Sequence, residues 1–224
     1  MADTNPPKLV QTGPERYEAG LAFRYQMPDA PGPYPTCVMV HGRRGDEDVM
    51  WIFRRAVPRP WLVVAPRAPL ADGELYSWLI QSPDQWPDLA AFDPAVEALT
   101  RFLRSLPRLF NADPDRTYLM GFSQGAAVSI ATMLRHPTAA RGLAALVGFA
   151  PAAPDEAVAG RLDRLPAFLA VGARDETIPH EQSQRAADLL RRAGADLTYG
   201  EYPIGHKLTA GGMRDLQAWF AARQ

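Results

Sequence analysis

Short, continuously apolar segments recur along the chain, each about the length of one β-strand. Runs of this kind are typical of strands that are buried on both faces, as in a parallel sheet. The segment 21–27 instead alternates apolar and polar residues, and we predict that it forms an antiparallel strand at the edge of the sheet. In chain order, the predicted strands are residues 21–27, 36–40, 61–65, 116–120, 143–149, 167–171 and 196–202.

Segments with helical periodicity lie between the predicted strands. Residues 94–106 carry an apolar residue every three or four positions. Residues 124–135 are mostly small and apolar, as suits a buried helix. The predicted helices are residues 94–106, 124–135, 182–192 and 213–222. Strands that alternate with helices predict a three-layer α/β fold, in which helices flank a mostly parallel sheet. The length of 224 residues fits a single domain over residues 1–224.

Charge and cysteine content narrow the class of protein. The chain has 24 Lys and Arg against 25 Asp and Glu, a net charge of −1, so no basic field is present to hold nucleic acid. The single cysteine, Cys37, allows no disulfide within the chain and fits a reducing cytoplasm. The N-terminus lacks the pattern of a signal peptide, and the apolar runs are far shorter than a membrane span. We therefore expect a cytoplasmic protein without stable membrane insertion.

A serine lies where the predicted strand 116–120 turns into the predicted helix 124–135. The sequence there is Gly-Phe-Ser123-Gln-Gly, which has the strand–turn–helix context of a nucleophilic serine. The glycines remove side chains that would collide with the strand and the helix. The helix N-terminus behind Ser123 presents N–H groups and a positive dipole end to a developing oxyanion. A helix-capping serine is the alternative, so the prediction depends on finding a base.

A serine hydroxyl needs an adjacent base to become a nucleophile. His180 and His206 lie far enough downstream for the chain order Ser, Asp or Glu, His. His206 follows the last predicted strand on a loop with Gly and Pro, whereas His180 begins a helix, so we predict His206 as the base. Asp175 follows the strand 167–171 and is the predicted orienting acid. Glu176 beside it, and a purely helix-capping role for Asp175, are the alternatives.

The loop after the strand 36–40 is predicted to complete an oxyanion hole. One donor would be the backbone N–H of Gln124, and the other the backbone N–H of Arg43. Loss of one such donor typically raises the barrier by roughly 3–4 kcal/mol. We expect His41 to brace this loop through hydrogen bonds. Arg43 and Arg44 could attract an anionic substrate tail, or both could be solvated surface charges.

Together these motifs resemble the phospholipase/carboxylesterase family of α/β-hydrolases, which includes bacterial carboxylesterases and acyl-protein thioesterases. The matching segments are residues 41–42 and 45–46, 65–70 with 77–78, 121–126, 172–175 with 178–179, and 202–203 with 205–206. The resemblance implies an α/β-hydrolase fold. It also implies a cofactor-free esterase or thioesterase with the triad Ser123, Asp175 and His206.

The resemblance also points to residues that contact the substrate. It implies that the loop carrying Trp78 and Leu79 shapes the acyl pocket, where the usual Trp-Phe-Asp of the family reads Trp-Leu-Ile. Ile178 and Arg44 complete the candidate substrate-binding residues. The arginine pair after His-Gly is a second departure from the usual pattern, and it matches the "predicted esterase" branch of the family.

The spacing of the later strands limits what can cover the site. Only about 17 residues separate the predicted strands 143–149 and 167–171, which leaves no room for a large cap domain. We therefore predict an open site and a carboxylesterase that acts on small to medium acyl esters. A thioesterase or lysophospholipase of the same family is the alternative, and a non-catalytic binding protein with this fold is a second class. A cysteine hydrolase fails because Cys37 lies inside a strand, and the sequence leaves a monomer and a homodimer open.

Overall fold

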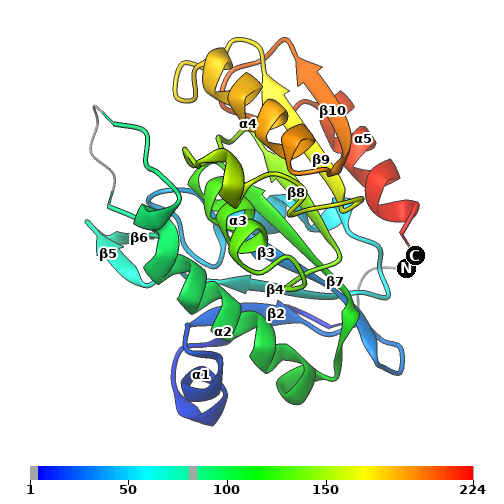
Figure 1. Ribbon diagram of the computed structural model, residues 1–224. Helices are drawn as coiled ribbons and strands as arrows, with labels where there is room; N and C mark the ends of the chain where they lie inside the picture. The colour runs from blue at the N-terminus through cyan, green and yellow to red at the C-terminus, as the bar shows by residue number, and fades with distance from the viewer. Residues whose placement is uncertain (1–4, 81–84, 224) are drawn as a thin grey trace.

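The computed structural model describes residues 5–80 and 85–223 (Figure 1). Within these residues, eight strands form one sheet in the order β1-β2-β4-β3-β7-β8-β9-β10. The strands β1 and β2 are antiparallel to their neighbours, and the pairs from β4 to β10 are all parallel. Their bounds are β1 (Lys8–Val10), β2 (Phe23–Gln26), β3 (Tyr34–Val40), β4 (Leu62–Pro66), β7 (Ala112–Phe122), β8 (Gly142–Leu146), β9 (Pro166–Gly172) and β10 (Asp196–Tyr202).

The prediction of a mostly parallel sheet is confirmed, and each predicted strand forms. One detail is wrong, because the strand predicted at the sheet edge, β2, is internal. The short strand β1 pairs with its outer side, with Lys8 opposite Tyr25 and Val10 opposite Phe23. A segment of three residues is too short to show a period, so the hydrophobic pattern did not predict this strand.

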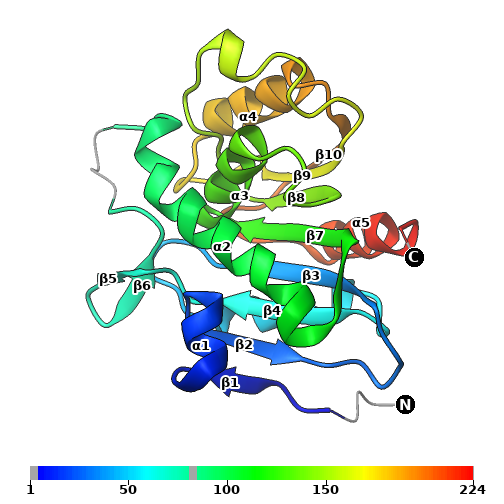
Figure 2. The ribbon, with the colours of Figure 1, turned by 60° about the horizontal axis from the view of Figure 1, so that its bottom comes forward.

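Helices cover both faces of the sheet (Figure 2). The helices α1 to α4 lie on one face, and α5 covers the opposite face together with the 3₁₀ helix η1. The bounds are α1 (Gly13–Ala19), η1 (Val49–Ala56), η2 (Ala90–Phe92), α2 (Asp93–Phe110), α3 (Gln124–Arg135), η3 (Asp155–Ala157), α4 (His180–Arg192) and α5 (Ala210–Ala221). The predicted three-layer arrangement is therefore confirmed.

Alternate residues of the central strands enter two separate hydrophobic cores. In β3, Val38 and Val40 pack under the α1–α4 layer, whereas Cys37 and Met39 pack under α5 and η1. All four side chains are fully buried. This two-sided burial is the physical reason why the strand sequences are continuously apolar.

Two connections of the sheet matter for the site. The connection from β8 to β9, residues 147–165, contains only the short η3 helix and turns, so no cap domain is inserted there. After β4 the chain forms a separate hairpin of β5 (Leu70–Asp72) and β6 (Leu75–Ser77), which was not predicted. Across the described residues, no helix has the length and apolar character that crossing a bilayer requires.

Candidate active site

The candidate nucleophile, Ser123, lies in the sharp turn between β7 and α3. Its backbone has φ 54° and ψ −120°, a conformation that side chains other than glycine rarely adopt. Such a residue costs of order 1–3 kcal/mol and persists only where its surroundings hold it. The Ser123 N–H donates a 2.9 Å hydrogen bond to the carbonyl of Leu146 in β8, which fixes the turn against the neighbouring strand.

Two glycines allow this turn to form. A Cβ atom on Gly125 would lie 2.1 Å from the carbonyl oxygen of Val40 in β3, and one on Gly121 would lie 2.3 Å from the carbonyl oxygen of Gly125. These are backbone contacts that no side-chain rotation can relieve. The close approach of β7, α3 and β3 therefore requires glycine at both positions, for the reason inferred from the motif.

An Asp–His pair lies at the carboxyl ends of β9 and β10. The Nδ1–H of His206 donates to Oδ2 of Asp175 over 2.7 Å, which leaves Nε2 of the ring free to accept a proton. The Asp175 side chain is 1% exposed, and its Oδ1 accepts the backbone N–H groups of Thr177 and Ile178 at 2.8 and 2.9 Å. The alternative acid, Glu176, is exposed, so the geometry favours Asp175.

Backbone contacts between two neighbouring loops hold this pair together. The Ala173 N–H donates to the Tyr202 carbonyl, and the Arg174 N–H donates to the Ile204 carbonyl, at 2.8 and 3.0 Å. The His206 ring also packs edge to face against Phe122, with 5.0 Å between the ring centroids. Since Phe122 precedes Ser123, this contact places the histidine beside the nucleophile.

Ser123 and His206 line the same cavity, which has a volume of about 500 Å³. Of the predicted substrate-binding residues, Arg44 and Ile178 line it. The motif analysis missed several of its walls, because these residues lie outside the recognised motifs. The described lining residues are Arg43, Arg44, Gln85, Trp86, Ser123, Gln124, Phe149, Thr177, Ile178 and His206.

The other two predicted substrate contacts, Trp78 and Leu79, are not among the described lining residues of this cavity. Trp78 is only 1% exposed, and its indole N–H donates to the carbonyl of His41 over 2.9 Å. The side-chain amide of Gln124 accepts the Trp78 N–H and donates to the Leu79 carbonyl, at 2.9 and 2.8 Å. This segment therefore supports the site from behind, and Leu79 lines a smaller adjoining hollow.

The loop that follows β3 reaches the nucleophile from the other side. A Cβ on Gly42 would lie 3.2 Å from Cβ of Ser123, so the backbone of this loop passes directly against the serine. The N–H of Arg44 is already used, since it donates to Oγ of Ser77 over 3.0 Å. The N–H groups of Arg43 and Gln124 thus stay the predicted oxyanion donors, and both residues line the cavity.

His41 is fully buried at the base of this loop. Its Nε2 accepts the N–H of Ala68 over 2.9 Å, so the proton lies on Nδ1, which donates to the Gly42 carbonyl over 2.7 Å. Burial lowers the pKa of His41 to about 4, which keeps the ring neutral near pH 7. The contacts are those of the bracing role expected for this histidine.

An ion pair between the buried Glu47 and the half-buried Arg67, which the motifs did not reveal, anchors the same loop. Glu47 and Arg67 form two hydrogen bonds of 2.6 Å each, and Arg67 also lies over the ring of Tyr76. Burial acts to raise the pKa of Glu47, but the hydrogen bonds and charge of Arg67 outweigh it and the pKa is lowered. Two charges that lie 20 residues apart leave no local signal in the sequence.

Other reactive groups do not gather elsewhere in the described chain. Cys37 lies fully buried within β3, and burial raises the pKa of its thiol, which makes it a poor nucleophile. Within residues 5–80 and 85–223, no group of three His, Cys, Asp or Glu side chains could hold a metal ion.

A strained serine after a parallel strand, with an Asp–His pair following two later strands, defines a protein of the α/β-hydrolase class. Solved structures share this fold. A carboxylesterase from Mesorhizobium loti has a TM-score of 0.82 and 20% identity, covering 96% of this chain and 98% of that chain. A Bacillus cereus carboxylesterase has a TM-score of 0.84 and 19% identity, with 93% and 97% covered.

The phospholipase/carboxylesterase family model matches residues 39–223, so the chain belongs to this family. Acyl-protein thioesterase 1 of Mycosarcoma maydis is 28% identical over 84% of this chain and 90% of its own length. Carboxylesterase SOBER1 of Arabidopsis thaliana is 27% identical over 50% of each chain. The chain thus spans about half the length of the plant relatives it matches.

Proposed function

We propose that the protein is a serine carboxylesterase that hydrolyses small to medium acyl esters. The observation that carries this proposal is the 2.7 Å hydrogen bond between His206 and the buried Asp175, in loops beside the strained Ser123. A base oriented by a buried carboxylate, next to a hydroxyl on a sharp turn, is the arrangement that activates a serine.

In the first half of the proposed reaction, Nε2 of His206 takes the proton of Ser123 as Oγ attacks the ester carbonyl. The carbonyl oxygen becomes an oxyanion that the N–H groups of Gln124 and Arg43 stabilise. Asp175 holds the tautomer and stabilises the imidazolium. His206 then returns the proton to the alcohol, which leaves as the bond between carbon and alcohol oxygen breaks.

In the second half, water hydrolyses the acyl-enzyme. His206 removes a proton from the water, the hydroxide adds to the same carbonyl carbon, and the tetrahedral intermediate collapses as Ser123 recovers its proton. The net reaction adds one water to one ester and gives a carboxylate, an alcohol and a proton. No group other than these side chains and backbone donors is needed.

A thioesterase is the second candidate, because the relative that covers most of this chain is named an acyl-protein thioesterase. The same acyl-enzyme forms when a thiol leaves in place of an alcohol. Comparing kcat/KM for an ester and a thioester with the same acyl group separates the two. We also propose the cytoplasm as the location, on the grounds of a single, buried cysteine.

The nucleophile is tested by Ser123→Ala, with turnover of 4-nitrophenyl butanoate and labelling by a fluorophosphonate as the readouts. We expect kcat to fall by about 10⁴-fold or more and labelling to disappear, since no other group can form the acyl-enzyme. Asp175→Asn should lower kcat strongly while the label still reaches Ser123 slowly. Full turnover by the Ser123→Ala protein would overturn the proposal, and no turnover by the natural protein would favour a binding protein.

A further inference from the structure

The walls of the Ser123 cavity carry an unbalanced charge. Its described lining residues include two arginines, Arg43 and Arg44, and no Asp or Glu. The carboxylate of Asp175 lies beneath the site at 1% exposure, where His206 and two backbone N–H groups already bind it. A cavity whose described walls carry positive charge and no exposed carboxylate favours an anionic group on whatever it binds.

The two arginines differ in what they contact. Nε of Arg44 donates to Oδ1 of Asp72 over 3.0 Å, and the other carboxylate oxygen of Asp72 accepts the hydroxyl of Ser77 over 2.8 Å. Because the backbone N–H of Arg44 binds the same Ser77, this arginine is held on the β5–β6 hairpin. Hydrogen bonds from Ser77 and Arg44 lower the pKa of Asp72, which keeps the pair charged.

Arg43, by contrast, is exposed and forms no hydrogen bond or ion pair within the described part of the chain, although its charge also helps to lower the pKa of Asp72. It is also the residue whose backbone N–H is placed in the oxyanion hole, so its side chain begins one residue from the reacting carbonyl. From this position the guanidinium can reach a charged group of the substrate that lies only a few atoms from the scissile bond.

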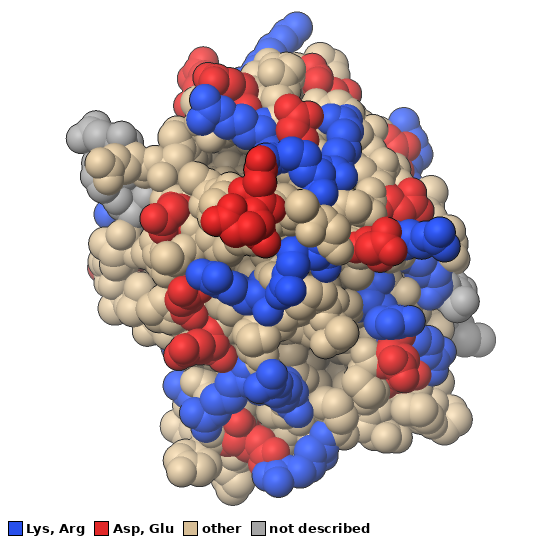
Figure 3. All heavy atoms as spheres, viewed as in Figure 1, with Lys and Arg blue, Asp and Glu red and all other residues tan. Residues whose placement is uncertain are grey.

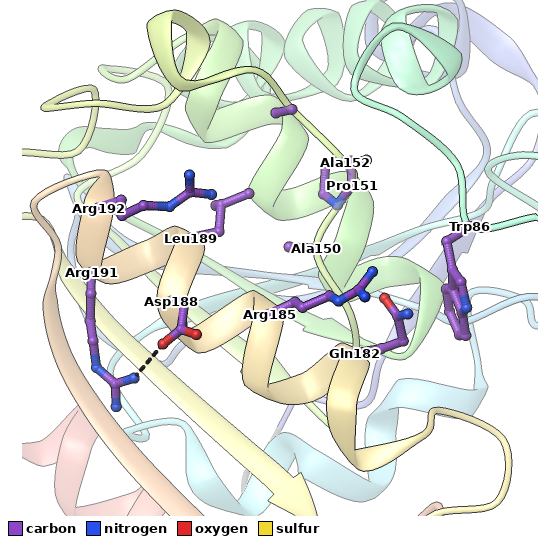
Figure 4. Close-up of a pocket in the computed structure, with 11 residues that line it drawn as sticks. Trp86, Ala150, Pro151, Ala152, Gln182, Arg185, Asp188, Leu189, Arg191 and Arg192 are labelled. Carbon is purple, nitrogen blue, oxygen red and sulfur yellow. Dashed lines mark hydrogen bonds and ion pairs between the residues drawn. The ribbon is translucent and has the colours of Figure 1, made fainter.

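The arginines that line a larger hollow next to the site are paired with carboxylates, as is usual for surface arginines. It has a volume of about 670 Å³ and shares the Trp86 wall with the Ser123 cavity (Figure 4). Each arginine that lines it is paired with a carboxylate, as the Arg191–Asp188 contact in Figure 4 illustrates. The pairs are Arg185–Glu181, Arg191–Asp188 and Arg192–Asp155.

Acidic and basic side chains are also intermixed on the face shown in Figure 3. With a net charge of −1, the chain as a whole offers anions no general attraction. Any preference for an anionic substrate must therefore arise locally, and Arg43 is the cation in the cavity that is left to provide it.

We propose that the Arg43 guanidinium selects esters that carry a carboxylate, on either the acyl or the leaving-group side of the scissile bond. This inference rests on the proposed esterase function and names its substrate class. Guanidinium binds carboxylate through two parallel hydrogen bonds, which a neutral ester cannot accept in the same way. Hydrolysis is unchanged in its balance: water is added, one C–O bond breaks, and a dicarboxylate or a hydroxy-carboxylate is released.

The test compares two matched pairs of esters. Mono-(4-nitrophenyl) adipate against 4-nitrophenyl hexanoate places the charge on the acyl side, and 4-acetoxybenzoate against its methyl ester places it on the leaving group. We expect the natural protein to prefer the charged member of one pair, and Arg43→Gln to reduce that preference by about tenfold to a hundredfold. The readout is the ratio of kcat/KM values within a pair, which cancels any uniform effect on the oxyanion hole.

Two control variants sharpen the result. Arg43→Lys keeps the charge and should retain part of the preference, whereas Arg141→Ala removes one positive charge just before β8, at the end of the sheet away from the site, and should leave the ratio unchanged. Equal kcat/KM values within both pairs for the natural protein would overturn the proposal. An unchanged ratio in Arg43→Gln would overturn it equally.

A binding measurement separates this inference from the esterase proposal itself. Calorimetric titration of the Ser123→Ala protein with adipate needs no turnover, and Arg43→Gln in that background should weaken binding by a similar factor. If the natural protein turned over none of the esters but the Ser123→Ala protein still bound adipate through Arg43, the esterase proposal would be refuted and the carboxylate site kept. Turnover with no effect of Arg43 on either readout would refute the site alone.

Discussion

At the scale of single residues, the candidate site depends on residues that their surroundings hold in one backbone conformation or one protonation state. Ser123 keeps an unfavourable backbone conformation because β8 holds its N–H and because glycines stand where β3 and α3 come closest. His41 is buried and neutral, with one ring nitrogen that accepts and one that donates. Ser123 and His41 each lie in a turn that forms part of the candidate active site, and these contacts hold the turn in place.

The buried His41 gives stability a specific pH dependence. Its pKa is about 4 in the folded protein, against about 6.5 in an unfolded chain, so the unfolded chain binds more protons between these values. The contribution of His41 to the free energy of unfolding should therefore be fully present above about pH 6.5 and decline as the pH falls towards 4. Over this window the contribution of His41 is about 3 kcal/mol.

Urea unfolding of the natural protein and of His41→Gln across this pH range measures that contribution. The variant should be less stable at pH 7, because it loses two buried hydrogen bonds, and should lose less stability on acidification. The remaining histidines are common to both proteins and cancel in the comparison. Parallel pH profiles for the two proteins would show that His41 is not the titrating group.

At the scale of elements, the oxyanion loop is held by a hairpin that lies outside the main sheet. Gly45 pairs with Tyr76 of β6 through backbone hydrogen bonds of 3.0 Å in both directions. Arg44 binds Asp72 and Ser77 of the same hairpin, and Glu47 binds Arg67 between β4 and β5. We infer that the hairpin acts as a clamp that holds this loop, and with it the predicted oxyanion donor Arg43, against the serine.

Removing the charge of Glu47 should loosen this clamp. In Glu47→Gln the half-buried guanidinium of Arg67 loses its counter-ion, and we expect a loss of about 2 kcal/mol in the free energy of unfolding. We also expect kcat to fall with little change in KM, because the oxyanion donor is misplaced mainly towards the transition state.

The matched control is Asp93→Asn, which removes the same charge from the exposed pair with Arg135. Surface pairs of this kind contribute about 1 kcal/mol or less, so stability and kcat should change little. Denaturant unfolding and steady-state kinetics on both variants decide the matter. Equal effects of the two substitutions would argue against a clamp that involves Glu47.

At the scale of the whole molecule, two hydrophobic cores support the sheet, and the described residues form no cap domain over the candidate site. The cores lie on opposite faces of the sheet, and the connection between β8 and β9 adds no cap over the site. The Ser123 cavity of about 500 Å³ is walled by the rings of Trp86 and Phe149, whose centroids lie 4.8 Å apart. We expect this shape to accommodate short acyl groups and to leave longer ones in solvent.

We therefore expect kcat/KM for 4-nitrophenyl esters to level off or fall between medium acyl chains and palmitoyl. An uncovered site gains little from added methylene groups, since each would contribute only if it were removed from water. The measurement is a series of esters from acetyl to palmitoyl at concentrations below micelle formation. A steep, continuous rise to the longest chain would point to a deep acyl tunnel instead.

Much of the fold follows from local patterns. The continuous apolar runs at 36–40 and 61–65 predicted parallel strands, because burial on both faces requires such runs. The predicted segments 124–135 and 196–202 match α3 and β10 at both ends. The internal position of β2 was not predicted, since its outer partner β1 has only three residues. The hairpin was also missed, because its strands are short and partly exposed.

The sequence by itself determined the order of strands and helices and the positions of Ser123, Asp175 and His206, because turns and buried runs are encoded over a few neighbouring residues. The tertiary structure decided which groups surround that serine. Trp78 was expected in the substrate pocket but is buried behind it, and Arg44 is held by Asp72, whereas Arg43 makes no hydrogen bond or ion pair to the described residues. Such contacts join side chains far apart in the chain, and only the packing of strands against loops brings them together.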